Sequence, residues 1–412
     1  MQTLTVIRNK AGFYENIVLN IISKMTKGSL LLFLPDGQQL QLGDGKGGVS
    51  ANITIKDVAF YKKLVLYGDI GFGEAFVNGL WDTDDITSVI KWVLLNIEHA
   101  PSVSGSKTKT VMLNLFKWLN KIYHNNRSNS ISGSQKNIAE HYDLNNEFFA
   151  TFLDQTMTYS SGYFPEANTS LLDSQYAKYD RLARQMNLQP TDHVLEIGSG
   201  WGGNAIFMAS TYGCRVTSVT LSREQQKLAM ERVREAGLTE KVEIIIRDYR
   251  DIEGEYDKIV SIEMLEAVGH NYYEQYFAKC NEVLKPDGIL AFQVITSPDS
   301  RYHHLQEGVD WIQKHIFPGS LLPSVAKLNE AINKTSDFTL VDLKDMGLDY
   351  ARTLQFWFDR FNENLTKIKA LGFDDIFIRK WQYYLNYCEA AFAMRNINVM
   401  QMVYTRPNNT NR

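Results

Sequence analysis

Between His193 and Val294, short apolar runs alternate with amphipathic segments, and this alternation limits the possible folds more than any other feature of the chain. The runs with strand character are His193–Ile197, Arg215–Val219, Val242–Ile246, Lys258–Ile262 and Ile289–Val294. The segments between them with helical character are Asn204–Thr211, Ser222–Ala236 and Tyr272–Val283. Strands that alternate with helices form parallel sheets with helices on both faces. The sequence therefore predicts a doubly wound, Rossmann-like α/β sheet.

The regions on either side of this core have a different character. Residues 1–100 predict a smaller N-terminal α+β domain, with a helix at Ile17–Met25 and strands at Ser29–Phe33 and Ala51–Ile55. The stretch from Gly68 to Asp85 mixes glycines with aromatic residues, and no element is assigned to it. The segment LKPDG at 284–288 predicts a turn, and the mostly helical remainder contains two further expected strands, Phe338–Leu343 and Val399–Tyr404.

Residues 101–136 form a distinct basic segment, which contains six basic residues and no acidic one. Within it, Val111–His124 predicts an apolar helix with Lys117 and Lys121 one turn apart. This helix is either a linker that packs on a neighbouring domain or a basic amphipathic helix that lies on an anionic membrane. The expected organisation is thus an accessory domain at 1–100, a linker at 101–136 and a main domain at 137–412.

Composition excludes several classes of protein. Of the 412 residues, 44% are hydrophobic and 22% are charged, which is typical of a chain with ordinary folded cores. The formal charge of −4 argues against dedicated nucleic-acid binding. Three cysteines with no CxxC pair, and histidines without ligand spacing, fit neither a disulfide scaffold nor a metal site. No apolar run approaches the length of a membrane helix, so we expect a soluble cytoplasmic protein.

The stretch VLEIGSGWGG, residues 194–203, carries the strongest chemical signal. Its glycines satisfy GxGxxG, which by itself is a weak indication of a dinucleotide site. The second strand ends in VTLS, without the acidic residue that a nicotinamide site uses to hold the ribose. Glu196 would repel a pyrophosphate but suits an ammonium group. The motif therefore favours S-adenosylmethionine over a dinucleotide or a purely structural glycine turn.

Two later stretches lie at the carboxyl ends of strands, where such sheets bind ligands. Ser222 and Gln225 have the spacing of a helix capping box, although Thr220 and Gln225 also lie where the second strand opens onto the cofactor cleft. In RDYRD, residues 247–251, Asp248 is placed to accept from an adenine amine and Tyr249 to stack on the ring. The alternative interpretation of RDYRD is a turn with solvated charges.

Taken together, several stretches resemble the cyclopropane-fatty-acyl-phospholipid synthase family, and the likeness extends over about residues 137–407. The matching stretches are NIAEHYDLNNEFFATFLDQTMTYSSGYF (137–164), VLEIGSGWGG, VTLSREQQ (219–226), RDYRD, SIEMLEAVGH (261–270), IFPGSLLPS (316–324) and YYLNYCEAAF (383–392). The resemblance implies an S-adenosylmethionine-dependent methyltransferase fold. It also implies transfer of a methylene group from S-adenosylmethionine to the cis double bond of an unsaturated phospholipid acyl chain, which closes a cyclopropane ring.

The resemblance and the motifs give a set of expected cofactor-binding residues. They are Tyr159, Ser160, Glu196, Gly198, Ser199, Gly200, Gly202, Thr220, Leu221, Gln225, Asp248, Tyr249 and Arg250.

The resemblance also implies a catalytic centre that holds a bicarbonate ion as the proton acceptor. Its expected residues are Glu266, Tyr350, Gln293, Ser161 and Ile295, with Cys388 included by resemblance alone. Ser161 and Gln293 depart from the commonest pattern, which has cysteine and histidine. Glu266 is either the holder of the ion or the base itself, whereas Glu263 better fits an exposed carboxylate at a helix start. Cys388 lies in an apolar helix, where inert buried cysteines are usual.

Three rival functions remain open at this point. One is an acyl-chain methyltransferase that leaves a methyl or methylene branch without ring closure, and another is an amine N-methyltransferase for a small molecule. The third is a binding protein without turnover. The expected partners are an unsaturated phospholipid at the inner membrane face and a second copy of the chain in a homodimer, with no nucleic acid and no metal.

Overall fold

The computed structural model describes residues 12–99 and 145–410, which form two compact units. Unit 1 comprises residues 12–99, 303–318 and 365–396, and unit 2 comprises 145–302, 319–364 and 397–410. The expected boundaries place all of 137–412 in one domain, whereas the contacts assign two stretches of that range to unit 1. The segment with Lys117 and Lys121 lies outside the described residues.

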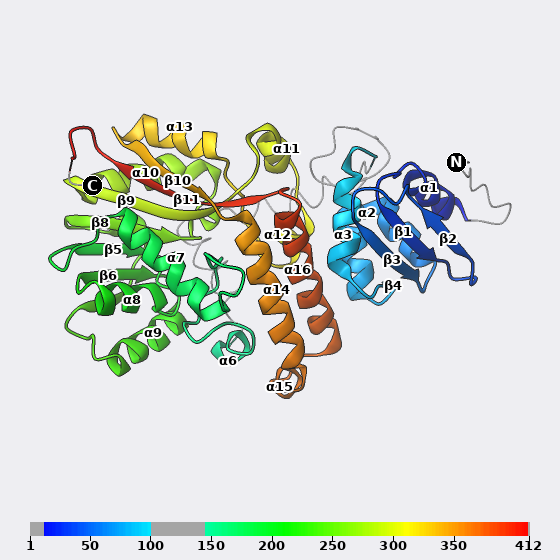
Figure 1. The fold of residues 1–412 in the computed structure, drawn as a ribbon, viewed down its shortest axis with the longest axis horizontal. Coiled ribbons are helices and arrows are strands. Elements are labelled where there is room, and N and C mark those ends of the chain that lie inside the picture. The colour runs from blue at the N-terminus through cyan, green and yellow to red at the C-terminus, as the bar shows by residue number, and fades with distance from the viewer. Residues whose placement is uncertain (1–11, 100–144, 411–412) are drawn as a thin grey trace. The chain divides into compact units, whose positions relative to one another are not determined.

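Unit 2 is built on a seven-stranded sheet in the order β10-β11-β9-β8-β5-β6-β7 (Figure 1). The strands are β5 (His193–Ile197), β6 (Arg215–Thr220), β7 (Val242–Ile246), β8 (Tyr256–Ile262), β9 (Leu284–Thr296), β10 (Thr339–Asp345) and β11 (Asn398–Thr405). The strands from β7 to β9 are parallel, and β11 and β10 are antiparallel to their neighbours. The predicted doubly wound sheet with a late pair of strands is confirmed.

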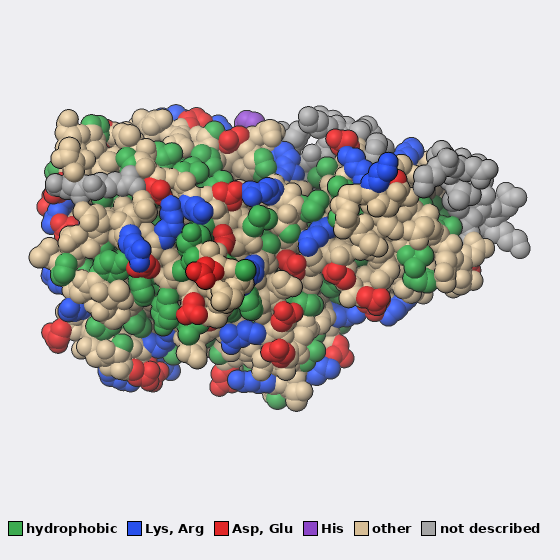
Figure 2. Space-filling view, in the orientation of Figure 1, with side chains coloured by type: hydrophobic (Ala, Val, Ile, Leu, Met, Phe, Trp, Pro, Cys, Tyr) green, Lys and Arg blue, Asp and Glu red, His purple; other side chains and the backbone are tan. Residues whose placement is uncertain are grey.

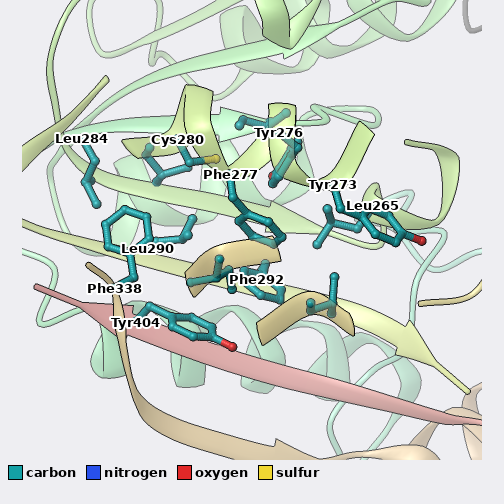
Figure 3. Packing of buried hydrophobic residues seen from close by; sticks show 14 of the residues in the cluster. Leu265, Tyr273, Tyr276, Phe277, Cys280, Leu284, Leu290, Phe292, Phe338 and Tyr404 are labelled. Carbon is teal, nitrogen blue, oxygen red and sulfur yellow. The ribbon is translucent and has the colours of Figure 1, made fainter. Parts of the chain in front are cut away.

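Helices cover both faces of this sheet. The helices of unit 2 are α6 (Asn146–Phe149), α7 (Leu171–Gln185), α8 (Gly203–Thr211), α9 (Arg223–Glu235), α10 (Tyr273–Val283), α13 (Val325–Thr335) and α14 (Gly347–Glu363). The short 3₁₀ turns are η2 (Tyr249–Asp251), η3 (Leu265–Ala267), η4 (His270–Tyr272) and η5 (Asp299–Arg301). One apolar core joins α7, α8 and α9 to the sheet, and a second joins α10 and α13 to it. Figure 3 shows this second core, in which Phe292 of β9 lies between Phe277 of α10 and Tyr404 of β11.

Strand β9 is longer than the sequence predicts. The turn expected at 284–288 is instead the first part of β9, because Leu284 pairs with Tyr256 and the register then shifts before Lys258 pairs with Ile289. This irregularity accommodates the Pro-Asp-Gly sequence, so the strand continues through it.

Unit 1 contains a four-stranded sheet in the order β2-β1-β3-β4. Its elements are α1 (Phe13–Ile22), β1 (Ser29–Phe33), β2 (Gln39–Leu42), β3 (Ser50–Ile55), α2 (Ala59–Val77), β4 (Trp81–Asp82), α3 (Ile86–Leu95), η1 (Ile97–His99), α12 (Trp311–His315), α15 (Leu365–Ala370) and α16 (Asp375–Ala393), together with most of α11 (Tyr302–Glu307). The unassigned stretch 68–85 supplies half of α2 and all of β4. Gly68 has φ +59 inside α2, so the helix kinks there.

Specific contacts hold the later segments of the chain in unit 1. Helix α16 packs on α2 and α3. Thr87 donates to Asn386 over 2.7 Å, and Arg379 donates to the Phe76 carbonyl over 2.9 Å while its guanidinium lies 4.0 Å from the Phe76 ring centroid. Glu74 accepts from Lys314 and His315, and although burial raises its pKa, these bonds lower it to about 2. Unit 1 is therefore discontinuous in sequence.

Three general observations concern the surface, the helices and the potential metal ligands. Basic and acidic side chains are interspersed over the face shown in Figure 2. Within residues 12–99 and 145–410, no helix is both long and apolar enough to cross a bilayer. Across the same residues, no three His, Cys, Asp or Glu side chains are grouped so that they could hold a metal ion.

Candidate active site

A pocket in unit 2 lies at the carboxyl ends of β5, β6 and β8, where the strand order reverses. All but three of the expected cofactor-binding residues line it, and the exceptions are Gly202, Asp248 and Arg250. The lining also contains residues that the sequence analysis did not single out, among them Met157, Thr158, Trp201, Asn204 and Met264.

The glycine loop between β5 and α8 shapes one wall of this pocket. Gly198, Gly200 and Gly202 have φ values of +101, +48 and +83, a conformation that favours glycine. A Cβ at Gly200 would meet no atom within 4 Å, so that side of the loop is open to a ligand. Gly202 caps α8 and so turns the free amides of the helix N-terminus toward the loop. The backbone thus comes close to any ligand in the pocket.

Glu196 lies at the base of the pocket and is 2% exposed. Its carboxyl group accepts from Asn204 over 2.8 Å and from the Ser218 hydroxyl. Burial raises the pKa of Glu196 to about 7, although both hydrogen bonds oppose that rise. A cationic ligand group beside it would favour the ionised form.

The predicted capping box at α9 is only half formed. Ser222 accepts from the Gln225 amide over 3.2 Å, as a cap does. The Gln225 side chain, however, accepts from the Thr220 hydroxyl over 2.9 Å instead of reaching back to the backbone of Ser222. Thr220 and Gln225 therefore form a hydrogen-bonded pair on the pocket wall.

Asp248 and Arg250 pair with each other rather than face the pocket. The Arg250 guanidinium donates to Asp248 through Nε at 2.8 Å and through a terminal nitrogen at 2.6 Å. Tyr249 between them does line the pocket. The role expected for Asp248 at an adenine amine stays a prediction, since its carboxylate already has these partners.

Beside the pocket, a polar cluster is centred on the half-buried Glu263, which directly follows β8. The Glu263 carboxylate accepts from the Ser161 amide over 2.9 Å and from Gln293 Nε2 over 2.7 Å, both at Oε1. Its Oε2 accepts from the Tyr350 hydroxyl over 2.9 Å. Glu263 is also part of the pocket lining. The prediction that Glu263 is an exposed helix-start carboxylate is therefore wrong.

The backbone explains why sequence reasoning missed this residue. Glu263 has φ +51, which is uncommon for a residue with a side chain, and its amide donates to the Gln293 carbonyl over 2.7 Å. The left-handed turn directs the carboxylate into the cluster. Two acidic residues just after a strand, in SIEMLE, were the available signal, but only the turn decides which of them faces inward.

Glu266, on η3, lies next to this cluster and is 8% exposed. Its Oε1 accepts from the Ile295 amide, whereas the resemblance implies that both residues hold a bicarbonate ion. Its Oε2 has no hydrogen-bond partner among the described residues. Burial raises the pKa of Glu266 to about 8, and the charge of Glu263 adds to the rise. Both effects favour the protonated form of Glu266.

Lys178, on α7, is a basic residue whose charge acts on Glu263. Its ammonium is fully buried and donates to the Ser160 hydroxyl over 2.8 Å. Burial lowers the pKa of Lys178 to about 7, while the carboxylates of Glu263 and Asp154 oppose the fall. The pKa of Glu263 itself is raised by burial, against the effect of Lys178 and the three donors.

The expected bicarbonate ion does not fit this arrangement. Three of its expected donors, on Ser161, Gln293 and Tyr350, already serve Glu263, and the Ile295 amide serves Glu266. A further anion beside Glu263 would meet like charge in a low-dielectric site without free donors among these residues.

Cys388 is on α16, which belongs to unit 1, whereas the residues described above belong to unit 2. Burial raises the pKa of its thiol, and Asp310 adds to the rise. Such a thiol stays protonated at neutral pH, so these surroundings do not support a thiolate. The catalytic role of Cys388 stays a prediction.

Comparison with known proteins agrees with this geometry. Residues 129–402 match the model of the mycolic acid cyclopropane synthetase family. The chain belongs to this family. It is accordingly an S-adenosylmethionine-dependent methyltransferase, and the pocket residues fit that cofactor, since an open glycine loop and a buried carboxylate face the same space.

Two relatives and one solved structure show how far the likeness extends. Tuberculostearic acid methyltransferase UfaA1 of Mycobacterium tuberculosis is 39% identical over 84% of this chain and 81% of its own. The cyclopropane-fatty-acyl-phospholipid synthase of Escherichia coli K12 is 36% identical over 87% of this chain and 89% of its own. The crystal structure of the mycolic acid cyclopropane synthase CmaA1 with SAH and CTAB superposes with a TM-score of 0.61, at 28% identity, over 66% of this chain and 98% of that one.

Proposed function

We propose that this chain forms a cyclopropane ring on an unsaturated phospholipid acyl chain, at its cis double bond, with S-adenosylmethionine as the source of the added carbon. The bound cofactor supplies an electrophilic methyl group. The glycine loop and Glu196 would hold it, and the cluster around Glu263 would take up the proton that ring closure releases.

The observation that carries this proposal is the acidic pair at the pocket, in which Glu266 is buried and Glu263 lines the pocket. Methyl addition to an alkene leaves a cationic carbon on the lipid, which water would trap. Ring closure then needs a proton acceptor within hydrogen-bond reach of the added carbon, in a dry site. Glu263 lines the pocket and Glu266 is buried beside it, which meets both requirements.

The direct test is lipid analysis of cells that express the protein, and of vesicles incubated with the purified enzyme and S-adenosylmethionine. We expect unsaturated acyl chains to become one CH2 heavier. Proton NMR of the product should show a cyclopropane methylene and the loss of the olefinic signals. Unchanged lipids, with methylation of a small amine instead, would contradict the proposal and favour the N-methyltransferase alternative.

A second candidate is the formation of a branched acyl chain without a ring. The relative at 39% identity is named a tuberculostearic acid methyltransferase, which favours this alternative. A methylene branch has the same mass as a cyclopropane, so mass alone does not separate them. Hydrogenation over a mild catalyst does, because it adds hydrogen to the branch alkene and leaves the ring intact.

We further propose that the protein acts at the inner membrane face, where its lipid substrate lies. The support is the basic composition of residues 101–136. Replacement of Lys117 and Lys121 by Gln should weaken binding to anionic vesicles by about 1 kcal/mol per charge. If variant and parent sediment equally with the vesicles, the segment is better interpreted as a linker. The expected homodimer stays a prediction that light scattering can check.

A further inference from the structure

The cluster around Glu263 allows one step beyond the proposed function, on which it rests. We propose that the Glu263 carboxylate is itself the proton acceptor of ring closure and occupies the position in which the resemblance places a bicarbonate ion. Glu266 acts as its protonated neighbour. The enzyme would then need no external anion.

The first support is the convergence of donors. Three groups donate to Glu263 within 2.7–2.9 Å, namely the Ser161 amide, the Gln293 carboxamide and the Tyr350 hydroxyl. Bonds of this kind favour the ionised form of the acceptor. Glu266 receives only the Ile295 amide, and its second oxygen has no partner among the described residues. When the pair holds one proton, the proton therefore belongs on Glu266 and the charge on Glu263.

The second support is a polarised chain of side chains that fixes the direction of the Gln293 amide. Arg181 can only donate, and it donates to Gln401 Oε1 over 2.9 Å. Gln401 Nε2 must then be the donor to Gln293 Oε1, over 3.0 Å. This leaves Gln293 Nε2 to point at Glu263. Asp342 anchors the far end through Arg181 at 2.7 Å.

The third support is position. Ser161, Gln293, Ile295, Tyr350 and Glu266 are absent from the described lining of the cofactor pocket, whereas Glu263 belongs to it. Its backbone is held at φ +51, a strained conformation that is often found at functional sites. The carboxylate is thus the member of the cluster that a reacting group in the pocket can reach.

The chemical step balances with the residues present. A C–H bond of the newly added methyl breaks, and its electron pair forms the C–C bond to the cationic carbon that closes the ring. The proton goes to a Glu263 oxygen and leaves to solvent after product release. No oxidant, reductant or second anion is required.

The first test uses the parent enzyme in carbonate-depleted buffer with vesicles of unsaturated phospholipid. We expect the same rate of cyclopropane formation with and without added bicarbonate. A rate that depends on bicarbonate would overturn the inference while leaving the proposed function intact. Absence of any lipid product under both conditions would instead overturn the proposed function on which the inference rests.

Two variants sharpen the test. Glu263→Gln preserves size but removes the acceptor, and should lower the rate by about 10²–10⁴-fold, as for loss of a general base. Glu263→Gly suits the positive φ and leaves three donors around an open space, so added bicarbonate or formate should restore part of its rate. Glu240→Gln, at an exposed position, is the matched control and should be unaffected. A fully active Glu263→Gln enzyme would refute the inference.

A measurement of bicarbonate binding tests the inference without depending on enzyme turnover. The carbon NMR signal of labelled bicarbonate should broaden when the Glu263→Gly protein is added, and should stay sharp when the parent is added. Calorimetric titration with S-adenosylmethionine shows whether each variant is folded. Bicarbonate binding by the parent would contradict the assignment of this position to Glu263.

Discussion

At the scale of single residues, burial controls the charges in this site more than pairing does. Glu196, Glu266 and Lys178 all titrate closer to neutrality than their ordinary values because water cannot reach them. Groups with such perturbed pKa values gather at functional sites. Of these three residues, Glu196 lines the pocket, so a charged ligand group there would change its protonation on binding.

Glu196 gives a pH-dependent prediction. Its pKa in the folded protein, about 7, is raised above the ordinary carboxyl value, so the folded state without ligand loses stability as the pH rises from about 4.5 to about 7. An ammonium group of the cofactor favours the ionised form, so affinity should rise over the same range. Glu196→Gln should remove this pH dependence and cost about 1.5–3 kcal/mol of binding at alkaline pH.

Calorimetric titration of parent and variant on both sides of pH 7 measures both effects. The Glu240→Gln variant is a useful control, because Glu240 is exposed and is absent from the described pocket lining. An affinity for S-adenosylmethionine that is the same in parent and Glu196→Gln at every pH would contradict the placement of Glu196 at the ammonium group.

At the scale of elements, strand register positions the catalytic cluster. In the antiparallel pairing of β9 with β11, Gln293 and Gln401 lie directly opposite each other, which is why their side chains meet. Sequence patterns predicted both strands but not their pairing register. The polar partner of Gln293 could therefore not be identified, because a shift by one residue would have placed Gln401 on the other face.

This pairing gives the second prediction. In Gln401→Glu, the carboxylate still accepts from Arg181 but cannot donate to Gln293. Gln293 then has either an unpaired oxygen or a reversed amide that turns this oxygen toward Glu263. Both outcomes weaken the donor set at Glu263, and we expect the rate of ring closure to fall by about tenfold or more, the effect of roughly 1.4 kcal/mol.

Cofactor affinity separates this effect from general damage, since Gln401 lies outside the described pocket lining and S-adenosylmethionine binding should be nearly unchanged. The matched variant Gln401→Met removes the polarised chain without adding charge. It should lower the rate of ring closure less than Gln401→Glu does. Equal rates for Gln401→Glu and the parent would show that the chain does not orient Gln293.

At the scale of the whole molecule, the sequence pattern predicted the sheet of unit 2 far better than it predicted which segments belong to which unit. The sheet follows from local periodicity, which a single sequence contains. The assignment of α12 and α16 to unit 1 depends on contacts such as Thr87 with Asn386, which join residues far apart in the sequence. Glu263 was missed for a related reason, since a left-handed backbone at a glutamate has no sequence signal.

The discontinuity of unit 1 gives the last prediction, which concerns a fragment of residues 1–126. In the whole chain, Val89 and Trp92 on α3 are fully or almost fully buried, and α16 packs on that helix. Burial of one such side chain contributes about 1.5–3 kcal/mol, whereas a domain is stable by only about 5–15 kcal/mol in all. Loss of α16 also removes the Asn386 partner of Thr87 and the Arg379 donor to the Phe76 carbonyl. The fragment should therefore lack a cooperative unfolding transition and a fixed near-ultraviolet circular dichroism spectrum, and the intact chain should show both. A fragment that unfolds cooperatively, with slow amide exchange in β1 and β3, would show that residues 303–318 and 365–396 are dispensable for this unit.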